Sequence, residues 1–366
     1  MNKLLTIIAS IFLFTVSITS LYAKGITFSG TAPTVTGTTN DAAINNALET
    51  MFNKMLYDAQ NSFSNVGNMP IFLRYMAAAN TQVSNAATQI NYLNYNLFAI
   101  TLGTSFAEIG SGDKREAYRD ITTKGDMRIG EASQSWALQA GFNAKFLLDG
   151  LYLAAKLGKT KNHQTYGILV NYDFFKERLL DEFAIWKGLK LGSGLIYQQN
   201  KINIPLDANI QYLPTTEYGY TLRMLLQPDL LMKINSNAII IPIEAITTMG
   251  IISSFHNYEM GNGCNTLSLL LTTGVGVDIN YGSTKINMEN KSRYIFELAG
   301  TPEAVIENPG KVKVHTDINK QRPYYLHPKI MLGLSIGLAG IISDFSYSFY
   351  PIGSGFSTNI SVGMTY

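Results

Sequence analysis

Apolar residues alternate with small or polar residues over much of the chain after Gln89, most clearly in the last eleven residues. One set of alternate positions is apolar, aromatic or threonine: Phe356, Thr358, Ile360, Val362, Met364 and Tyr366. The positions between them are small or polar: Ser357, Asn359, Ser361, Gly363 and Thr365. Because successive side chains of a strand point to opposite faces, residues 356–366 are predicted to form a strand with one apolar face.

The same alternation recurs upstream and predicts about twelve strands in residues 89–366. The earlier segments are residues 97–106, 135–146, 151–158, 166–174, 189–198, 218–227, 239–245, 273–281, 294–298, 330–339 and 344–349. Asp149-Gly150 and residues 235–237 indicate tight turns. Fourteen strands would result if residues 201–213 and 282–290 also pair, and ten if two predicted strands merge.

The first 23 residues have the features of a secretory signal peptide. Lys3 supplies the positive start, residues 4–16 the apolar core, and residues 20–23 a plausible cleavage site. The alternative is an N-terminal membrane anchor, for which the apolar run is short. Lys24 rather than cysteine follows the predicted cleavage site, so lipidation of a new N-terminal cysteine is not expected.

Residues 24–88 precede the strands and have helical rather than alternating periodicity. Residues 24–39 are rich in Gly, Thr and Ser and are predicted to be an extended lead-in. A helix capped by Asn40 or Asp41 follows, and a second begins near Pro70 and runs to about Ala87. Two helices before the strands predict a plug inside a barrel or a periplasmic cap beneath it. The alternative is a packed helical hairpin of a soluble domain.

The composition favours a membrane protein. Charged residues make up 15% of the chain, against about 25% in typical soluble domains. After residue 23 no run of about 18 apolar residues offers a spanning helix. Because a bilayer tolerates only helices and edge-free sheets, we expect a closed antiparallel transmembrane β-barrel, an all-β membrane fold, over residues 89–366. A soluble β-sandwich is the alternative, but its second face would carry more charge.

Eight charged residues are candidates for the lumen face. They are Lys145, Lys156, Asp173, Lys190, Arg223, Glu244, Asp278 and Asp344. Both signs occur, so no anion or cation preference follows. We expect these residues to pair with one another or with the N-terminal helices.

No catalytic, cofactor or metal site is expected. The four histidines share no metal-ligand spacing, and no histidine with a serine and an orienting partner can be identified. Cys264 is the single cysteine, which excludes an internal disulfide and cysteine-rich metal sites. The formal net charge of +2 gives no reason to expect nucleic acid as a partner.

The end of the chain resembles the C-terminal targeting signal of diderm outer-membrane proteins, in which a terminal aromatic residue follows alternating apolar positions. The residues that carry this resemblance are Phe356, Ile360, Val362, Met364 and Tyr366. It implies the outer membrane as location, its lipid as a partner, and the barrel-assembly machinery as a partner of the last strand. Loops at residues 110–131, 257–266 and 300–328 are expected at the cell surface.

The order of helices and strands resembles the FadL-type transporters of hydrophobic compounds, which carry an N-terminal hatch inside the barrel. No short motif matches, an Asn-Pro-Ala near the N-terminus included, so no site residue is carried over. The Asn- and Ile-rich composition and the signal peptide also resemble spirochaete surface proteins. Two functions follow: a plugged channel or transporter for small solutes, hydrophobic ones being one option, or a surface-exposed structural or adhesin barrel that acts through its loops.

Overall fold

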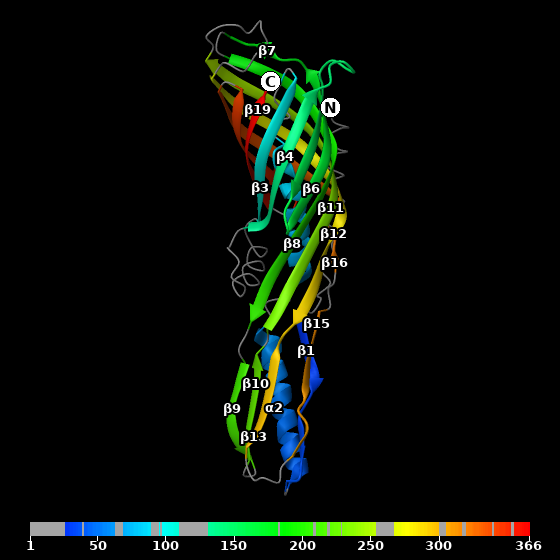
Figure 1. Cartoon of the computed structure of the whole chain (residues 1–366), viewed down its shortest axis with the longest axis vertical. Helices are drawn as coiled ribbons and strands as arrows, with labels where there is room; N and C mark the ends of the chain where they lie inside the picture. The colour runs from blue at the N-terminus through cyan, green and yellow to red at the C-terminus, as the bar shows by residue number, and fades with distance from the viewer. Residues whose placement is uncertain are drawn as a thin grey trace, which may run out of the picture.

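The computed structural model describes residues 26–38, 40–62, 69–88, 95, 97–109, 131–181, 184–207, 210–217, 220–227, 229–253, 267–299, 305–316, 320–338, 340–352 and 355–366. The molecule is elongated. A ring of long strands occupies one end and a slender stem the other (Figure 1). The predicted signal peptide, Cys264 and the predicted surface loops 110–131 and 257–266 lie wholly or mainly outside the described residues.

Ten antiparallel strands form the ring in the described part of the chain. In pairing order they are β3 (Phe98–Ile109), β4 (Glu131–Asn143), β5 (Leu151–Lys159), β6 (His163–Phe175), β8 (Ala184–Asp207), β11 (Asp229–Ser253), β12 (Leu267–Asn290), β17 (Leu326–Leu338), β18 (Ile341–Tyr350) and β19 (Gly355–Thr365). β8 pairs with both β6 and β11, and β19 pairs with β3, so the order returns to its start. The two-residue strands β7 (Arg178–Leu179) and β16 (Lys320–Gln321) complete a twelve-stranded sheet. The prediction of a large antiparallel sheet is confirmed.

Two segments predicted as ring strands lie in the stem instead. They contain β10 (Tyr220–Gln227) and β13 (Arg293–Ala299), which form a three-stranded sheet with β9 (Ile210–Glu217). Met224 and Leu226 of β10 pack in one hydrophobic core with Phe52 of α2 (Asp41–Ser62). Alternation could not separate these strands from ring strands, because a half-buried strand of a soluble sheet has the same period.

The predicted lead-in and one predicted loop pair with each other in the stem. β1 (Ile26–Thr31) pairs with β15 (Lys311–Thr316), and β2 (Thr34–Thr36) pairs with β14 (Val305–Asn308). The lead-in, predicted to be extended or mobile, thus contains two paired strands, and the prediction of a loop over residues 300–328 is wrong where β14 and β15 form. Local composition could not show this, because each strand depends on a partner at the other end of the chain.

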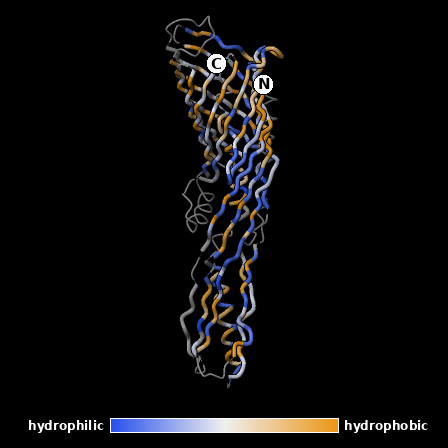
Figure 2. The backbone as a smooth tube through the Cα atoms, in the orientation of Figure 1, coloured by the Kyte–Doolittle hydropathy of each residue, from blue (hydrophilic) through white to orange (hydrophobic). Residues whose placement is uncertain are grey.

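The ring and the stem have opposite polarity, which is clearest along β11. In its stem part the buried residues are Leu230, Met232 and Ile234, and the opposite face carries Lys233 and Asn235. In its ring part the exposed residues are apolar, among them Ile239, Ile243 and Met249. The buried residues there include Ser236, Glu244 and Thr248. The stem thus has an apolar core, whereas the ring has an apolar exterior. Hydrophobic and hydrophilic residues alternate along the strands (Figure 2).

A helix fills the ring. α3 (Met69–Gln82) continues into the short 3-10 helix η2 (Val83–Asn85). α3 contacts β3, β4 and β19 on one side of the ring and β8, β11 and β12 on the other, so it lies inside. The notion of a plug fits α3, which occupies the interior of the ring, whereas α2 lies in the stem. We call residues 69–88 the plug.

Among the described helices, none combines the length and apolar character that a membrane crossing requires.

The plug joins two parts of the chain that lie at opposite ends of the ring. β1 and α2 are in the stem, whereas the C-terminus lies at the far rim (Figure 1). There the backbone amide of Tyr366 donates to the carbonyl of Phe98, where β3 begins. The chain therefore passes through the ring between α2 and β3.

Candidate functional site: the filled interior of the ring

Charged side chains line the inner face of the ring, where the other wall residues are mostly small or polar. Six of the eight predicted lumen residues lie on this face: Lys156, Asp173, Lys190, Glu244, Asp278 and Asp344. Lys145 is exposed in the turn between β4 and β5, and Arg223 lies on β10 of the stem beside Glu297. The prediction is wrong for these two, because a residue's position in an alternating run shows neither where the strand ends nor which sheet it joins.

Lys329 of β17 is the interior residue that the sequence pattern missed. Its ammonium group forms ion pairs with Glu244 of β11 and with Asp278 of β12, the latter at 2.7 Å. All three side chains are at most 2% exposed. The predicted strand began at Ile330, four residues after the start of β17, and so left out Lys329. Since the inward position of Lys329 follows from the alternation of β17, extending that strand by one residue would have identified it.

Both sides of the ring hold the plug through side chains. Lys156 of β5 donates to the carbonyl of Ser84 and to the hydroxyl of Thr88, both at 2.6 Å. Lys329 donates to Asn85 Oδ1 at 3.4 Å, and the Asn85 amide donates to the Tyr350 hydroxyl at 3.0 Å. β5 and β17 are five steps apart in the ten-strand order, which places them opposite each other. The plug is thus fastened across the full width of the interior.

The plug also touches the wall through its backbone. A Cβ atom at Gly103 of β3 would lie 2.6 Å from the Ala87 nitrogen and 2.8 Å from the Ala87 Cα. Ala87 itself has a φ of 61°, a conformation that residues with a side chain rarely adopt. A glycine is therefore needed at position 103 for the plug to sit this close.

Two further polar groups lie along the inner wall. Lys190 forms an ion pair with Asp173 at 3.0 Å, and its ammonium lies 4.1 Å from the centre of the Tyr152 ring. The Asp344 carboxylate accepts a hydrogen bond from Ser335 at 2.7 Å. Buried charges are costly unless they are paired. These contacts therefore stabilise a closed, polar interior.

His163 links three strands near the stem-side rim, in an arrangement that sequence reasoning did not find. Its Nε2 atom lies 3.1 Å from Ser135 Oγ, and its Nδ1 atom lies 2.9 Å from the Asn200 amide. All hydrogen bonds of this amide are satisfied when its NH2 group points toward Nδ1 and toward the carbonyl oxygens of Gln134 and Gln199. Nδ1 then accepts, so Nε2 carries the proton and cannot take one from Ser135. The contact connects β4, β6 and β8.

The predicted assembly residues lie on the outer face of β19. Ile360, Val362, Met364 and Tyr366 are exposed, and Phe356 is half-buried. Their role in assembly stays a prediction. Within the described ranges, no group of three or more His, Cys, Asp and Glu side chains is arranged to hold a metal ion.

A family model described as Lsa36-like matches residues 30–163 and residues 153–366, which together span more than half of the chain. The chain belongs to the Lsa36-like family. A search of curated proteins finds no match to this Lsa36-like chain.

Solved structures with some likeness to this Lsa36-like chain are outer-membrane proteins. Omp33 of Acinetobacter baumannii is 6% identical, with 75% of this chain and 99% of Omp33 covered and a TM-score of 0.24. CymD, a monoaromatic hydrocarbon channel, is 10% identical, with 79% and 94% covered and a TM-score of 0.22. TodX, the toluene transporter of P. putida, is 10% identical, with 78% and 94% covered and a TM-score of 0.23. TM-scores this low add nothing to the fold described above, and the resemblance to FadL-type transporters stays a prediction.

Proposed function

We propose that the protein is an outer-membrane β-barrel protein whose lumen is closed by its own plug and whose stem is held outside the membrane at the cell surface. The observation that carries the proposal is the reversal of polarity along β11. A soluble protein would not turn Ile239, Ile243 and Met249 outward in one part of a strand and bury Leu230, Met232 and Ile234 in another. The role needs neither catalysis nor a cofactor.

Aromatic side chains bound the apolar exterior at both rims, as in transmembrane barrels. At the stem side Tyr166 lies opposite Tyr197, Tyr197 opposite Ile239, and Ile239 opposite Tyr281. At the far rim the rings of Phe98 and Tyr366 stack at 5.7 Å. Phe356 and Tyr366 are ten residues apart on the outer face of the closing strand. At about 3.3 Å per residue and a tilt of about 40°, this spans about 25 Å, the height of the apolar band of such barrels.

The filled interior supports a role for the ring as an anchor of the stem rather than as an open pore. Lys156, Lys329 and Asn85 join the plug to opposite walls, and Gly103 admits its backbone at close range. A permanent channel would require these contacts to be absent. The ring then serves to hold the stem, which contains α2 and the strands that pack on it.

The connections between strands indicate which side of the membrane the stem occupies. Outer-membrane barrels have short periplasmic turns and longer extracellular connections. At the stem end two connections contain β9 and β10 or β13 to β16, beside short ones at residues 160–162 and 351–354, whereas the far-rim connections, residues 144–150, 176–183, 254–266 and 339–340, contain at most a two-residue strand among the described residues. The stem therefore belongs on the extracellular side.

Cysteine labelling on intact cells tests this placement. In a Cys264→Ser background, Glu49→Cys in the stem should react with a membrane-impermeant maleimide on intact cells. The matched variant Lys145→Cys, in an exposed far-rim turn, should react only after lysis. Labelling of Lys145→Cys alone on intact cells would place the stem in the periplasm and overturn the surface role.

Gated transport of small solutes is a second candidate, favoured by the polar wall beside the plug. The buried Ser105 hydroxyl on β3 has no hydrogen-bond partner among the described residues, and Ser357 and Ser361 of β19 are buried on the same inner face. Hydroxyls of this kind would suit a solute path if the plug moved. Such a path would need the contacts of Lys156 and Asn85 to open.

Planar-bilayer conductance separates the two candidates. The wild-type chain should show no steady conductance, because the plug fills the ring. The double variant Lys156→Ala/Asn85→Ala removes two plug contacts and keeps the Lys329 ion pairs. Conductance in this variant, but not in the wall variant Ser335→Ala, would favour transport. A wild-type chain that conducts continuously would contradict the closed lumen.

A further inference from the structure

Six exposed cationic side chains gather at the rim of the ring that faces the stem. They are Lys159, Lys161, Lys201, Lys285, Lys320 and Arg322, and we call them the basic collar. Lys201 and Lys285 both lie opposite Asn235 of β11, and Lys285 lies directly opposite Lys320. The backbone amide of Lys201 donates to the carbonyl of Asn162, which brings Lys161 beside this row. The collar therefore follows the rim across adjacent strands.

The strand segments that carry the collar contain no acidic residue, and the described acidic residues of this rim, Glu108 and Glu131, lie opposite each other on β3 and β4. Residues 159–166, 197–203, 235–239, 279–287 and 320–326 contain no Asp or Glu. None of the ion pairs between described residues includes a collar residue. Like charges directly opposite each other destabilise a sheet, so the pair Lys285 and Lys320 has a cost that an anion would relieve.

The far rim differs in charge pairing. There Lys176 pairs with Asp149, and Lys187 pairs with Glu177 at 3.1 Å. The hydrogen bond from Lys176 lowers the pKa of the Asp149 carboxyl. Lys176 and Lys187 at the far rim are thus paired with carboxylates, whereas the collar residues form no ion pair with a described residue. A general preference for surface lysine does not explain this difference.

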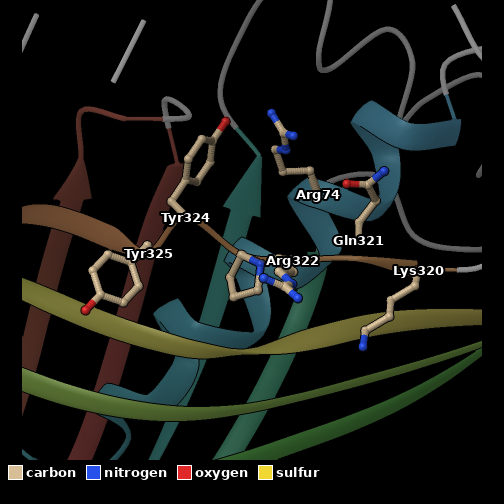
Figure 3. A pocket seen from close by; sticks show the side chains of 7 residues that line it. Arg74, Lys320, Gln321, Arg322, Tyr324 and Tyr325 are labelled. Carbon is tan, nitrogen blue, oxygen red and sulfur yellow. The ribbon is translucent and has the colours of Figure 1, made fainter. Parts of the chain in front are cut away.

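A cavity of about 450 Å³ adjoins the collar. Its lining includes Arg74 of the plug, Lys320, Arg322 and two tyrosines, Tyr324 and Tyr325, and no carboxylate. Arg74 and Tyr324 extend to one side of the segment 320–325, and Lys320 and Tyr325 extend to the other (Figure 3). The cavity offers cations from two elements and aromatic edges beside them. This is the chemistry that binds a phosphate joined to an apolar or sugar group.

The collar lies just beyond the tyrosine row that bounds the apolar exterior. Lys201 follows Tyr197 by four residues on β8, a distance of about 10 Å along the membrane normal at a tilt of about 40°. The headgroup region of a bilayer is about 5–8 Å thick on each side. Lysine side chains at this height reach the headgroups.

We infer that the basic collar binds the phosphate groups of anionic lipid headgroups in the leaflet on the stem side of the membrane. This inference rests on the proposed membrane-spanning ring. A lipid fits better than a soluble anion, because the cations extend along the rim across adjacent strands rather than converging on one point. Lys320 and Arg322 at the edge of the cavity then meet one headgroup, and the other lysines of the row meet its neighbours.

The test titrates the detergent-solubilised full-length chain with dioctanoyl phosphatidic acid and follows the midpoint of heat unfolding. A ligand that binds the folded state raises this midpoint. Dioctanoylglycerol, which lacks the phosphate, and inorganic phosphate are the comparison ligands. The collar variant is Lys201→Gln/Lys285→Gln/Lys320→Gln, and its matched control at the far rim is Lys145→Gln/Lys176→Gln/Lys187→Gln.

Phosphatidic acid should stabilise the wild type and the control variant, with dioctanoylglycerol and inorganic phosphate having little effect. A lysine near anionic lipid contributes about a fivefold change in binding, so half-saturation of the collar variant should rise about a hundredfold. Equal responses of the two triple variants would overturn the inference. An equal response of the wild type to inorganic phosphate would assign the collar to a soluble ion instead.

Flotation separates failure of this inference from failure of the proposed function. The wild-type chain should float with phosphatidylcholine vesicles, which tests membrane insertion alone. A chain that does not float overturns the proposed function and the collar with it. A chain that floats but shows no preference for phosphatidic acid overturns only the collar.

Discussion

At the scale of single residues, Lys329 joins three strands of the ring to the plug. It pairs with Glu244 and Asp278 on the two preceding strands and donates to Asn85 of η2. Sequence alternation placed Glu244 and Asp278 on the inner face but could not show that one lysine serves both. That contact depends on the register between β11, β12 and β17, which only the folded sheet sets.

Replacing Lys329 should test this contact. Lys329→Met keeps the length of the side chain but leaves two buried carboxylates without a cation. We expect the free energy of unfolding to fall by about 3–5 kcal/mol, measured by urea unfolding in detergent micelles. The triple variant Lys329→Met/Glu244→Gln/Asp278→Asn should regain most of this loss. A single variant as stable as the wild type would contradict the ion-pair network.

At the scale of elements, β8, β11 and β12 belong to two environments at once. Each runs from the ring into the stem, and the side that faces outward changes from apolar to polar near Gln199, Asn237 and Ser283. The hydroxyls of Ser236 and Thr284 hydrogen-bond at 2.7 Å at this point. A strand can change environment without a break because its alternation continues while the two faces exchange polarity.

Two arginine substitutions on β11 should separate these environments. Ile243→Arg places a charge in the apolar band and should lower stability by about 2–4 kcal/mol. Leu231→Arg lies on the same face of the same strand but in the stem, opposite Glu289, and should cost little. Heat-modifiable gel migration of extracted membranes measures both. Equal losses in the two variants would argue that no part of β11 faces lipid.

At the scale of the whole molecule, the ring closes between the first and last of its strands along the chain. β3 and β19 pair in register from Ala99 with Thr365 to Ile109 with Gly355. The plug lies immediately before β3 in the chain and inside the closed ring. Closure and filling of the ring are therefore coupled, since β19 must reach β3 while residues 69–88 remain inside.

A disulfide across this seam should test closure. In a Cys264→Ser background, Leu102→Cys/Val362→Cys places two thiols on directly opposite residues of β3 and β19. Such Cα atoms are about 5.5 Å apart, within the range that a disulfide spans. Oxidation should therefore cross-link the folded chain, as seen by a non-reducing gel. The control Leu138→Cys/Val362→Cys, one strand further on, should not cross-link. An open sheet would give no cross-link in either variant.

The sequence by itself determined the class of structure and the polarity of most ring strands. Alternation is a local property, because side chains of a strand point to opposite faces wherever the strand lies. It therefore identified the outer apolar face of residues 356–366, six inner charged residues and the helical character of the segments that became α2 and α3. It also showed that charge is scarce on the outer face.

Only the tertiary structure decided which strands form the ring and which form the stem. β10 and β13 alternate like ring strands, but their apolar faces cover α2. β1 and β2 could not be recognised, because their partners β15 and β14 lie at the other end of the chain. The basic collar was missed for the same reason. Lys201, Lys285 and Lys320 are far apart in sequence, and hydrogen bonding between strands places them in one row.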